Sequence, residues 1–89
     1  MSTKIVEKMS PAQCRAARAL LSMTQSELAK AAKLGLSTVV DFERGRRRVS
    51  TDAIRAMQDA LERAGIDFIR ANGGGAGIRL RNAHSHGKR

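Results

Sequence analysis

Four arginines lie close together in the middle of the chain, at Arg44, Arg46, Arg47 and Arg48. A guanidinium group stays charged at neutral pH and donates paired hydrogen bonds to phosphate. The sequence has 17 Lys and Arg against 8 Asp and Glu, a formal net charge of +9 in 89 residues. This charge favours a polyanionic partner, and nucleic acid is the first candidate. Because a charge run can also be a solvated loop, the surrounding elements have to decide its role.

Other residues that could bind a ligand or act in catalysis give weaker evidence for a function. His84 and His86 are two ligands in a polar tail, which do not make a metal site, so we expect no metal and no cofactor. The glycine run from Gly73 to Gly77 lies between two predicted strands, which favours a hairpin loop over a phosphate cradle. The single cysteine, Cys14, is expected to face the core. Without paired carboxylates or a Cys/His dyad, the sequence predicts no enzyme.

Composition narrows the class of partner and the location. The 89 residues suit one small domain. No apolar run approaches the roughly 20 residues of a membrane helix, and no signal-peptide pattern is present. We therefore expect a cytoplasmic, nucleoid-associated protein without a membrane partner. Phe42 and Phe68 are the only aromatic residues, which argues against base stacking on single strands or RNA.

The apolar spacing predicts four helices. Ser10 as an N-cap and Pro11 at the first helical position start the first one, which runs from Ala12 to about Met23. Thr24 and Glu27 form a capping box before the second helix. The other three helices are expected over Gln25 to about Ala32, over Leu36 to Arg44 with Gly45 as an αL cap, and from Ser50 or Thr51 to about Ala64.

After Gly65 the spacing of apolar residues changes from a helical period to alternation. Short strands are predicted over Ile66–Ile69 and Ile78–Arg81. Their apolar face must be covered by the chain's own helices or by a second copy, and we expect a homodimer. The expected dimer contacts are Leu61, Ile66, Phe68, Ile78 and Leu80. The predicted segments are thus a flexible arm over residues 1–9, a helical domain over 10–65, a β-hairpin element over 66–82 and a disordered tail over 83–89.

The segment from Gln25 to Arg44 predicts a helix-turn-helix. Small Ala29 lets the second short helix cross the first at a steep angle. The apolar side chains that fill the wedge between the two helices are Leu28, Leu34, Val39 and Phe42. This geometry frees one helix to lie in the major groove of double-stranded DNA.

One segment resembles the lambda-repressor-like (Cro/cI-type, XRE-type) helix-turn-helix family, and its sequence is RAARALLSMTQSELAKAAKLGLSTVVDFERGRR. The resemblance covers about Pro11 to Leu61, and its specific parts are Thr24–Ala29 and Asp41–Gly45. It implies a mainly α fold, a compact four-helix domain, here followed by a short two-stranded β element. Two positions depart from the family: Lys33 stands where a Gly is usual in the turn, and Gly35 where a Ser or Thr caps the third helix.

The resemblance also implies roles for individual residues. Arg18 and Glu43 should form a structural pair. The expected base-reading residues are Leu36, Ser37, Val40, Asp41 and Arg44. The expected phosphate contacts are Gln25, Ser26, Lys33, Thr38, Arg46, Arg47 and Arg48.

Together these features predict a transcriptional regulator that binds double-stranded DNA at specific sequences. A dimeric repressor on a partly palindromic operator is the leading hypothesis. An alternative is an antitoxin or a phage or mobile-element component whose DNA binding is modulated by a protein partner. A second alternative is a nonspecific architectural DNA-binding protein, which would have a small specificity ratio.

Overall fold

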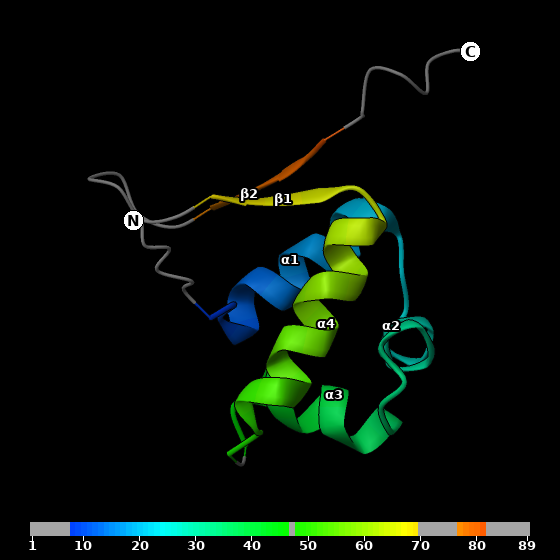
Figure 1. The fold of residues 1–89 in the computed structure, drawn as a ribbon, viewed down its shortest axis with the longest axis vertical. Helices are drawn as coiled ribbons and strands as arrows, with labels where there is room; N and C mark the ends of the chain where they lie inside the picture. The colour runs from blue at the N-terminus through cyan, green and yellow to red at the C-terminus, as the bar shows by residue number, and fades with distance from the viewer. Residues whose placement is uncertain (1–7, 47, 70–76, 82–89) are drawn as a thin grey trace.

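The computed structural model describes residues 8–46, 48–69 and 77–81. The elements, in order, are α1 (Pro11–Leu21), α2 (Gln25–Ala32), α3 (Leu36–Arg44), α4 (Thr51–Arg63), β1 (Ile66–Ile69) and β2 (Gly77–Leu80). The predicted fold class of four helices followed by a two-stranded hairpin is confirmed. In Figure 1, α3 lies at one end of the molecule and the hairpin at the other, with α4 running between them. No helix in the described ranges is long and apolar enough to cross a membrane.

Local hydrogen bonds fix where the helices begin. Ser10 accepts from the Gln13 backbone N–H at 3.0 Å, and the Gln13 side chain accepts from Ser10 in return at 2.9 Å. Thr24 and Glu27 form the predicted capping box before α2, with the same two distances. Ser50, rather than Thr51, caps α4. Each cap satisfies backbone donors that the first helical turn leaves without a partner.

The first three helices all end on a residue in the left-handed conformation. These residues are Ser22 with φ 55°, Lys33 with φ 61° and Gly45 with φ 65°. The next residue in each case donates a hydrogen bond back into the helix, as Leu34 does to the Ala29 carbonyl at 2.9 Å. Because Ser22 takes this conformation, α1 ends at Leu21, two residues before the predicted end at Met23.

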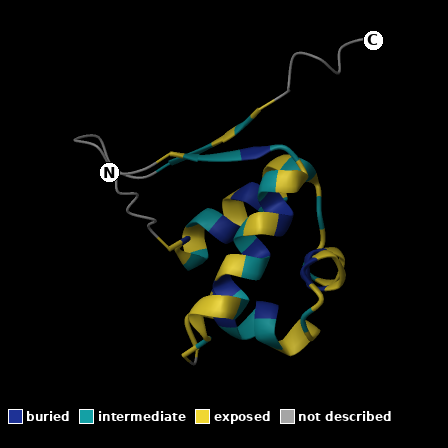
Figure 2. Cartoon of the chain, viewed as in Figure 1, coloured by how far each residue is buried: buried dark blue, intermediate teal, exposed yellow. Residues whose placement is uncertain are grey.

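The core lies between all four helices and the hairpin. It includes Cys14, which the sequence predicts to face the core, and Ala17. Figure 2 shows buried residues on the sides of the helices that face one another. Met9 is also buried, so the expected boundary of the N-terminal arm at residue 9 is wrong. Met9 precedes the N-cap and Cys14 is the fourth helical residue, which are the two positions of a hydrophobic staple. The apolar side chain therefore anchors the chain where α1 begins.

The two strands pair antiparallel, with Ile66 opposite Leu80 and Phe68 opposite Ile78. This apolar face packs against α1 and α4 of the same chain. The Gln13 side chain donates to the Gly77 carbonyl at 3.3 Å and ties β2 to α1. Residues 70–76, which include most of the glycine run, and the histidines of the predicted tail lie outside the described residues.

Packing of the hairpin on its own helices corrects part of the expected dimer surface. Leu61 and Ile66 are 0% exposed within one chain. A second copy cannot contact side chains that are already enclosed, so these two residues belong to the core. Phe68, Ile78 and Leu80 are half-buried against it.

Candidate nucleic-acid interface

The helices α2 and α3 form the tight unit that the sequence predicts. Leu28 of α2 and Val39 of α3 are fully buried, and Leu34 in the turn packs against the same core. Ala29 is buried as well, and its small side chain permits the close crossing of the two helices. The unit therefore holds α3 at the surface with one side fixed.

Helix α3 has a buried face and an exposed face. Val39, Phe42 and Glu43 point into the protein. Leu36 is 47% exposed, although burial of an apolar side chain of this size is usually favourable. The remaining residues expected to read bases are exposed at Ser37 and Arg44 and half-buried at Val40 and Asp41. All five are thus absent from the buried face of α3.

The expected pair of Arg18 and Glu43 is present in the structure. The Arg18 Nε and Nη2 atoms donate to the two Glu43 carboxylate oxygens, each at 2.7 Å. Gln25 donates from Nε2 to Glu43 Oε1 at 3.0 Å, and Cys14 donates from Sγ to Oε2 at 3.1 Å. Glu43 is 2% exposed and holds together the ends of α1, α2 and α3.

The hydrogen-bond donors around Glu43 stabilise the charged form of its carboxylate. Burial alone raises the pKa of Glu43, but the hydrogen bonds from Arg18, Cys14 and Gln25 outweigh it and hold that pKa below its usual range. The bond to Glu43 raises the pKa of Arg18. Burial and the Glu43 carboxylate both raise the pKa of the Cys14 thiol. The ion pair is therefore charged at neutral pH, and Cys14 is a protonated hydrogen-bond donor.

Sequence reasoning missed two contacts of Glu43. It placed Cys14 in the core without a partner, and it assigned no role to Arg15, whose guanidinium donates to the Glu43 main-chain carbonyl. A signal was available, since Cys14 and Arg18 are four residues apart and share one face of α1. Their common target on α3 lies 25 and 29 positions away and was not readable from α1 alone.

The residues expected to contact phosphate surround α3. Ser26 and Lys33 are exposed at the two ends of α2, and Arg46 and Arg48 are exposed after α3. Thr38 is half-buried, and its backbone N–H donates to the Gly35 carbonyl at 3.1 Å. Arg47 lies outside the described residues.

Gln25 is half-buried beside α3. Its side chain has two amide hydrogens. One is used on Glu43, at 3.0 Å, which leaves the other for a further acceptor. Gln25 therefore braces α3 through Glu43.

Comparison with known protein families also indicates a helix-turn-helix. A family model described as helix-turn-helix matches residues 15–68, which is more than half of the chain. A search of curated proteins found no match. The matched range contains α2, the turn, α3 and the whole Glu43 network apart from Cys14. The chain therefore belongs to the lambda-repressor-like (Cro/cI-type) helix-turn-helix family and is a DNA-binding regulator.

Proposed function

We propose that this protein is a sequence-specific repressor that binds a partly palindromic DNA operator as a homodimer. The observation that supports the proposal is that α3 has one buried face and one face at the protein surface. Its inner side is fixed by Val39, Phe42 and Glu43, while Leu36 and Ser37 are exposed at its N-terminal end. A helix that is fixed on its inner side and exposes Leu36 and Ser37 on the other side suits the major groove.

The outer face of α3 has the chemistry for direct readout. Leu36 and Val40 provide apolar contact for thymine methyl groups, and Ser37 can donate or accept. Asp41 provides an acceptor for the cytosine N4 amino group, and Arg44 a donor for a groove edge. We therefore assign base recognition to Leu36, Ser37, Val40, Asp41 and Arg44.

Residues around α3 supply sequence-independent contacts. Gln25 and Ser26 lie at the N-terminus of α2, where main-chain N–H groups and the helix dipole favour an anion. Lys33, Thr38 and the arginines that follow α3 provide further donors to phosphate oxygens. These contacts would fix the register of α3 on the duplex.

A homodimer explains how so small a domain achieves useful affinity. Two copies related by a two-fold axis read two half-sites about 10 bp apart centre to centre, or a multiple of that. Binding at a promoter would block access of polymerase, which is the simplest form of repression.

Selection of bound sites from random duplexes tests the proposal. The full chain is incubated with a random library at stated salt, and enriched sequences are measured for affinity against a scrambled duplex. We expect an enriched motif with two related halves and a specificity ratio of at least about 10³. Equal affinity for all duplexes, with a steep salt dependence, would make the protein an architectural DNA-binding protein instead.

A further inference from the structure

The C-terminal end of α3 is capped by donors from two parts of the chain. The last four carbonyls of a helix have no partner within it. In α3, main-chain N–H groups of the following turn donate to two of them, as the Arg46 N–H does to the Asp41 carbonyl at 2.9 Å. The Glu43 carbonyl accepts instead from Arg15 Nη1 of α1. A cation therefore lies at the end of α3 where the helix dipole favours positive charge.

Most of the Arg15 guanidinium is left for another acceptor. Arg15 is exposed, and within the described residues its only hydrogen bond is the one to Glu43. A guanidinium has five N–H donors in a planar fork, so one is used and the others face solvent. A side chain that is anchored in this way loses less rotamer freedom on binding an anion than an unanchored one.

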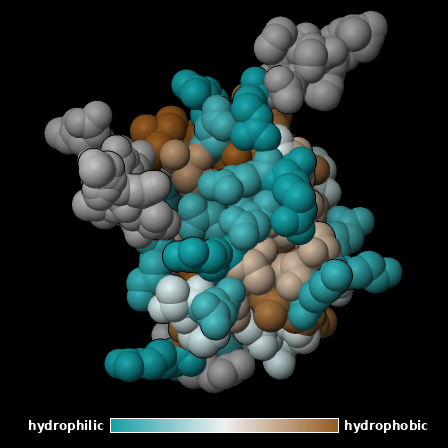
Figure 3. All heavy atoms as spheres, in the orientation of Figure 1, coloured by the Kyte–Doolittle hydropathy of each residue, from teal (hydrophilic) through white to brown (hydrophobic). Residues whose placement is uncertain are grey.

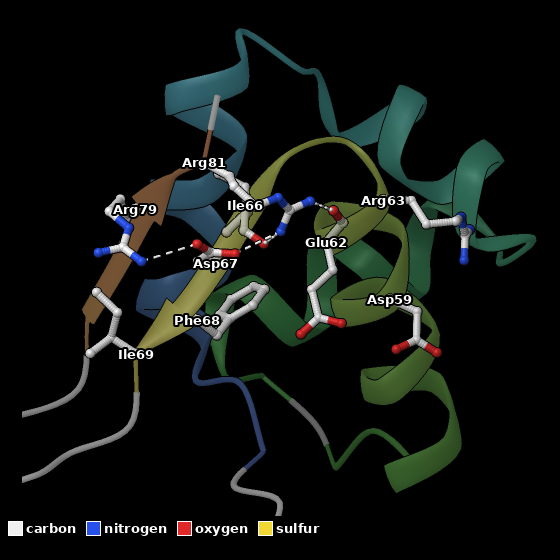
Figure 4. A pocket seen from close by; sticks show the side chains of 9 residues that line it. All are labelled: Asp59, Glu62, Arg63, Ile66, Asp67, Phe68, Ile69, Arg79 and Arg81. Atoms are coloured by element: carbon white, nitrogen blue, oxygen red, sulfur yellow. Dashed lines mark hydrogen bonds and ion pairs between the residues drawn. The ribbon is translucent and has the colours of Figure 1, made fainter. Parts of the chain in front are cut away.

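Other arginines have their donors engaged by a carboxylate of the same chain. Arg18 uses Nε and Nη2 on the two carboxylate oxygens of Glu43. Figure 4 shows the same arrangement at the hairpin, where the Arg81 guanidinium points to Asp67 at 2.6 Å. Such side chains would have to give up an ion pair to bind phosphate. Arg15 has no ion-pair partner in the ranges that the structure describes, so binding an anion costs it none.

The position of Arg15 distinguishes it from the rest of the hydrophilic surface. Figure 3 shows hydrophilic side chains over most of the face along α4, so an exposed polar group alone identifies no contact. The Arg15 guanidinium lies at the peptide group that joins Glu43 to the exposed Arg44. Arg46, also exposed, is held by its N–H to the last turn of α3. One guanidinium each from α1, α3 and the following turn therefore lies at this end of α3.

We propose that Arg15 is a DNA-binding residue, whose guanidinium donates to the Glu43 carbonyl and to a backbone phosphate at the same time. The proposal rests on the proposed function and adds to it a contact from α1, outside the helix-turn-helix unit. The planar guanidinium presents donors along more than one edge, so one edge can face the carbonyl while another faces two phosphate oxygens. Because the carbonyl belongs to α3, this contact would also fix α3 relative to the DNA backbone.

The salt dependence of binding separates a phosphate contact from a purely structural cap. Each phosphate that a cation neutralises releases counterions, so the logarithm of the binding constant falls with the logarithm of the salt concentration by about 0.9 per contact. Loss of the Arg15 contact should therefore lower this slope by about one. Loss of a residue that only supports α3 would weaken binding without changing the slope.

The first test titrates the full chain and three variants with a short duplex of random sequence at several salt concentrations. Arg15→Gln keeps an amide donor for the Glu43 carbonyl but loses the charge, so we expect about tenfold weaker binding and a slope lower by about one. Arg15→Lys keeps the charge and should keep the wild-type slope. Arg79→Gln removes the same charge from the hairpin, at the opposite end of the molecule from α3 (Figure 1), and should leave affinity and slope close to wild type.

The outcomes decide between the two roles of Arg15. A folded Arg15→Gln chain that binds more weakly with the wild-type slope would overturn the phosphate contact and leave Arg15 as a cap of α3. Unchanged affinity in that variant, or an equal loss of slope in Arg79→Gln, would also overturn it. Urea unfolding of each variant checks that the fold is intact.

The second test needs no variant and decides the question if Arg15→Gln does not fold. Wild-type protein is treated with phenylglyoxal, which modifies exposed guanidinium groups, with and without the duplex, and the modified positions are read by mass spectrometry. We expect the duplex to protect Arg15 and to leave Arg79 reactive. Equal reactivity of Arg15 in both samples would rule out the contact.

The random duplex keeps this inference distinct from the proposed function. Protection of Arg15 on a duplex, together with no preferred operator, would overturn the proposed function and support the contact. A preferred operator bound without protection of Arg15 would do the reverse. Wild-type protein that binds no duplex would overturn both.

Discussion

Arg18 donates hydrogen bonds to both carboxylate oxygens of Glu43, at 2.7 Å each, although the two residues are 25 positions apart in the chain. Glu43 lies next to Arg44, the last residue of α3. The pair therefore fixes the C-terminal end of α3 against α1. Its acidic member is enclosed, while the Arg18 side chain keeps 19% of its surface exposed. With this geometry the pair supports α3 from its inner side.

Glu43→Gln is expected to lower the free energy of unfolding by about 3 kcal/mol, because it leaves the Arg18 charge without its counter-ion. This is the lower end of the usual cost, since Arg18 is only partly buried. Urea unfolding at neutral pH measures the change. The double variant Arg18→Met/Glu43→Leu should recover most of the loss, because it removes both charges together. Asp67→Asn, which breaks ion pairs to the exposed side chains of Arg79 and Arg81, should have a much smaller effect. Wild-type stability in Glu43→Gln would contradict this role.

Acid should remove the contribution of Glu43. Its folded pKa is below the usual value, so the stabilisation is complete above the unfolded pKa of about 4.3 and is lost as the pH falls through the folded pKa. The difference in unfolding free energy between wild type and Glu43→Gln should therefore be constant from pH 7 to about 5 and shrink below about 4. Urea titrations across this range measure it. A difference that does not change with pH would show that Glu43 is not the titrating group.

Lys33→Gly is expected to raise the melting temperature. Lys33 ends α2 with φ 61°, and a left-handed backbone costs a residue with a side chain roughly 1–2 kcal/mol. Glycine loses more backbone entropy on folding, so we expect a net gain of at most about 1 kcal/mol. Lys30→Gly is the matched control, because it lies inside the same helix and should destabilise by about 1 kcal/mol. A lower melting temperature in Lys33→Gly would count against the proposed cost of this turn.

Arg46→Ala and Asp41→Ala should affect DNA binding in different ways. Arg46 is exposed just after α3, and its loss should weaken binding to all duplexes and reduce the salt slope by about one. Asp41 lies on α3, and its loss should instead change which base pairs are tolerated at one position. Titrations of single-base operator variants at several salt concentrations separate the two effects. If both variants behave alike, the assignment of base reading is wrong.

Cys14 should resist alkylation in the folded protein. It is fully buried, and burial together with the Glu43 carboxylate raises the pKa of the thiol, so little of the reactive thiolate forms at neutral pH. Mass spectrometry after iodoacetamide treatment should show labelling of Cys14 only in denaturant. Leu20→Cys provides an exposed thiol on the same helix that should label rapidly. Fast labelling of Cys14 under native conditions would show that the network opens readily.

Much of the local structure could be predicted from the sequence alone. The start of α2 depends on Thr24 and Glu27, three residues apart, and the end of α3 on the left-handed Gly45. Such contacts join residues within one helical turn, so the order of residue types is sufficient to identify them. The apolar alternation within each strand of the hairpin is also local, and the structure places Ile66 and Phe68 opposite Leu80 and Ile78.

Only the tertiary structure decided which side chains those elements enclose. Local pattern gave no reason for Cys14 to donate to a carboxylate 29 residues away. It also left open whether the chain's own helices or a second copy would cover Ile66. The physical reason is that burial and long-range pairing depend on how several elements pack at once, and residue order within one element does not contain that information.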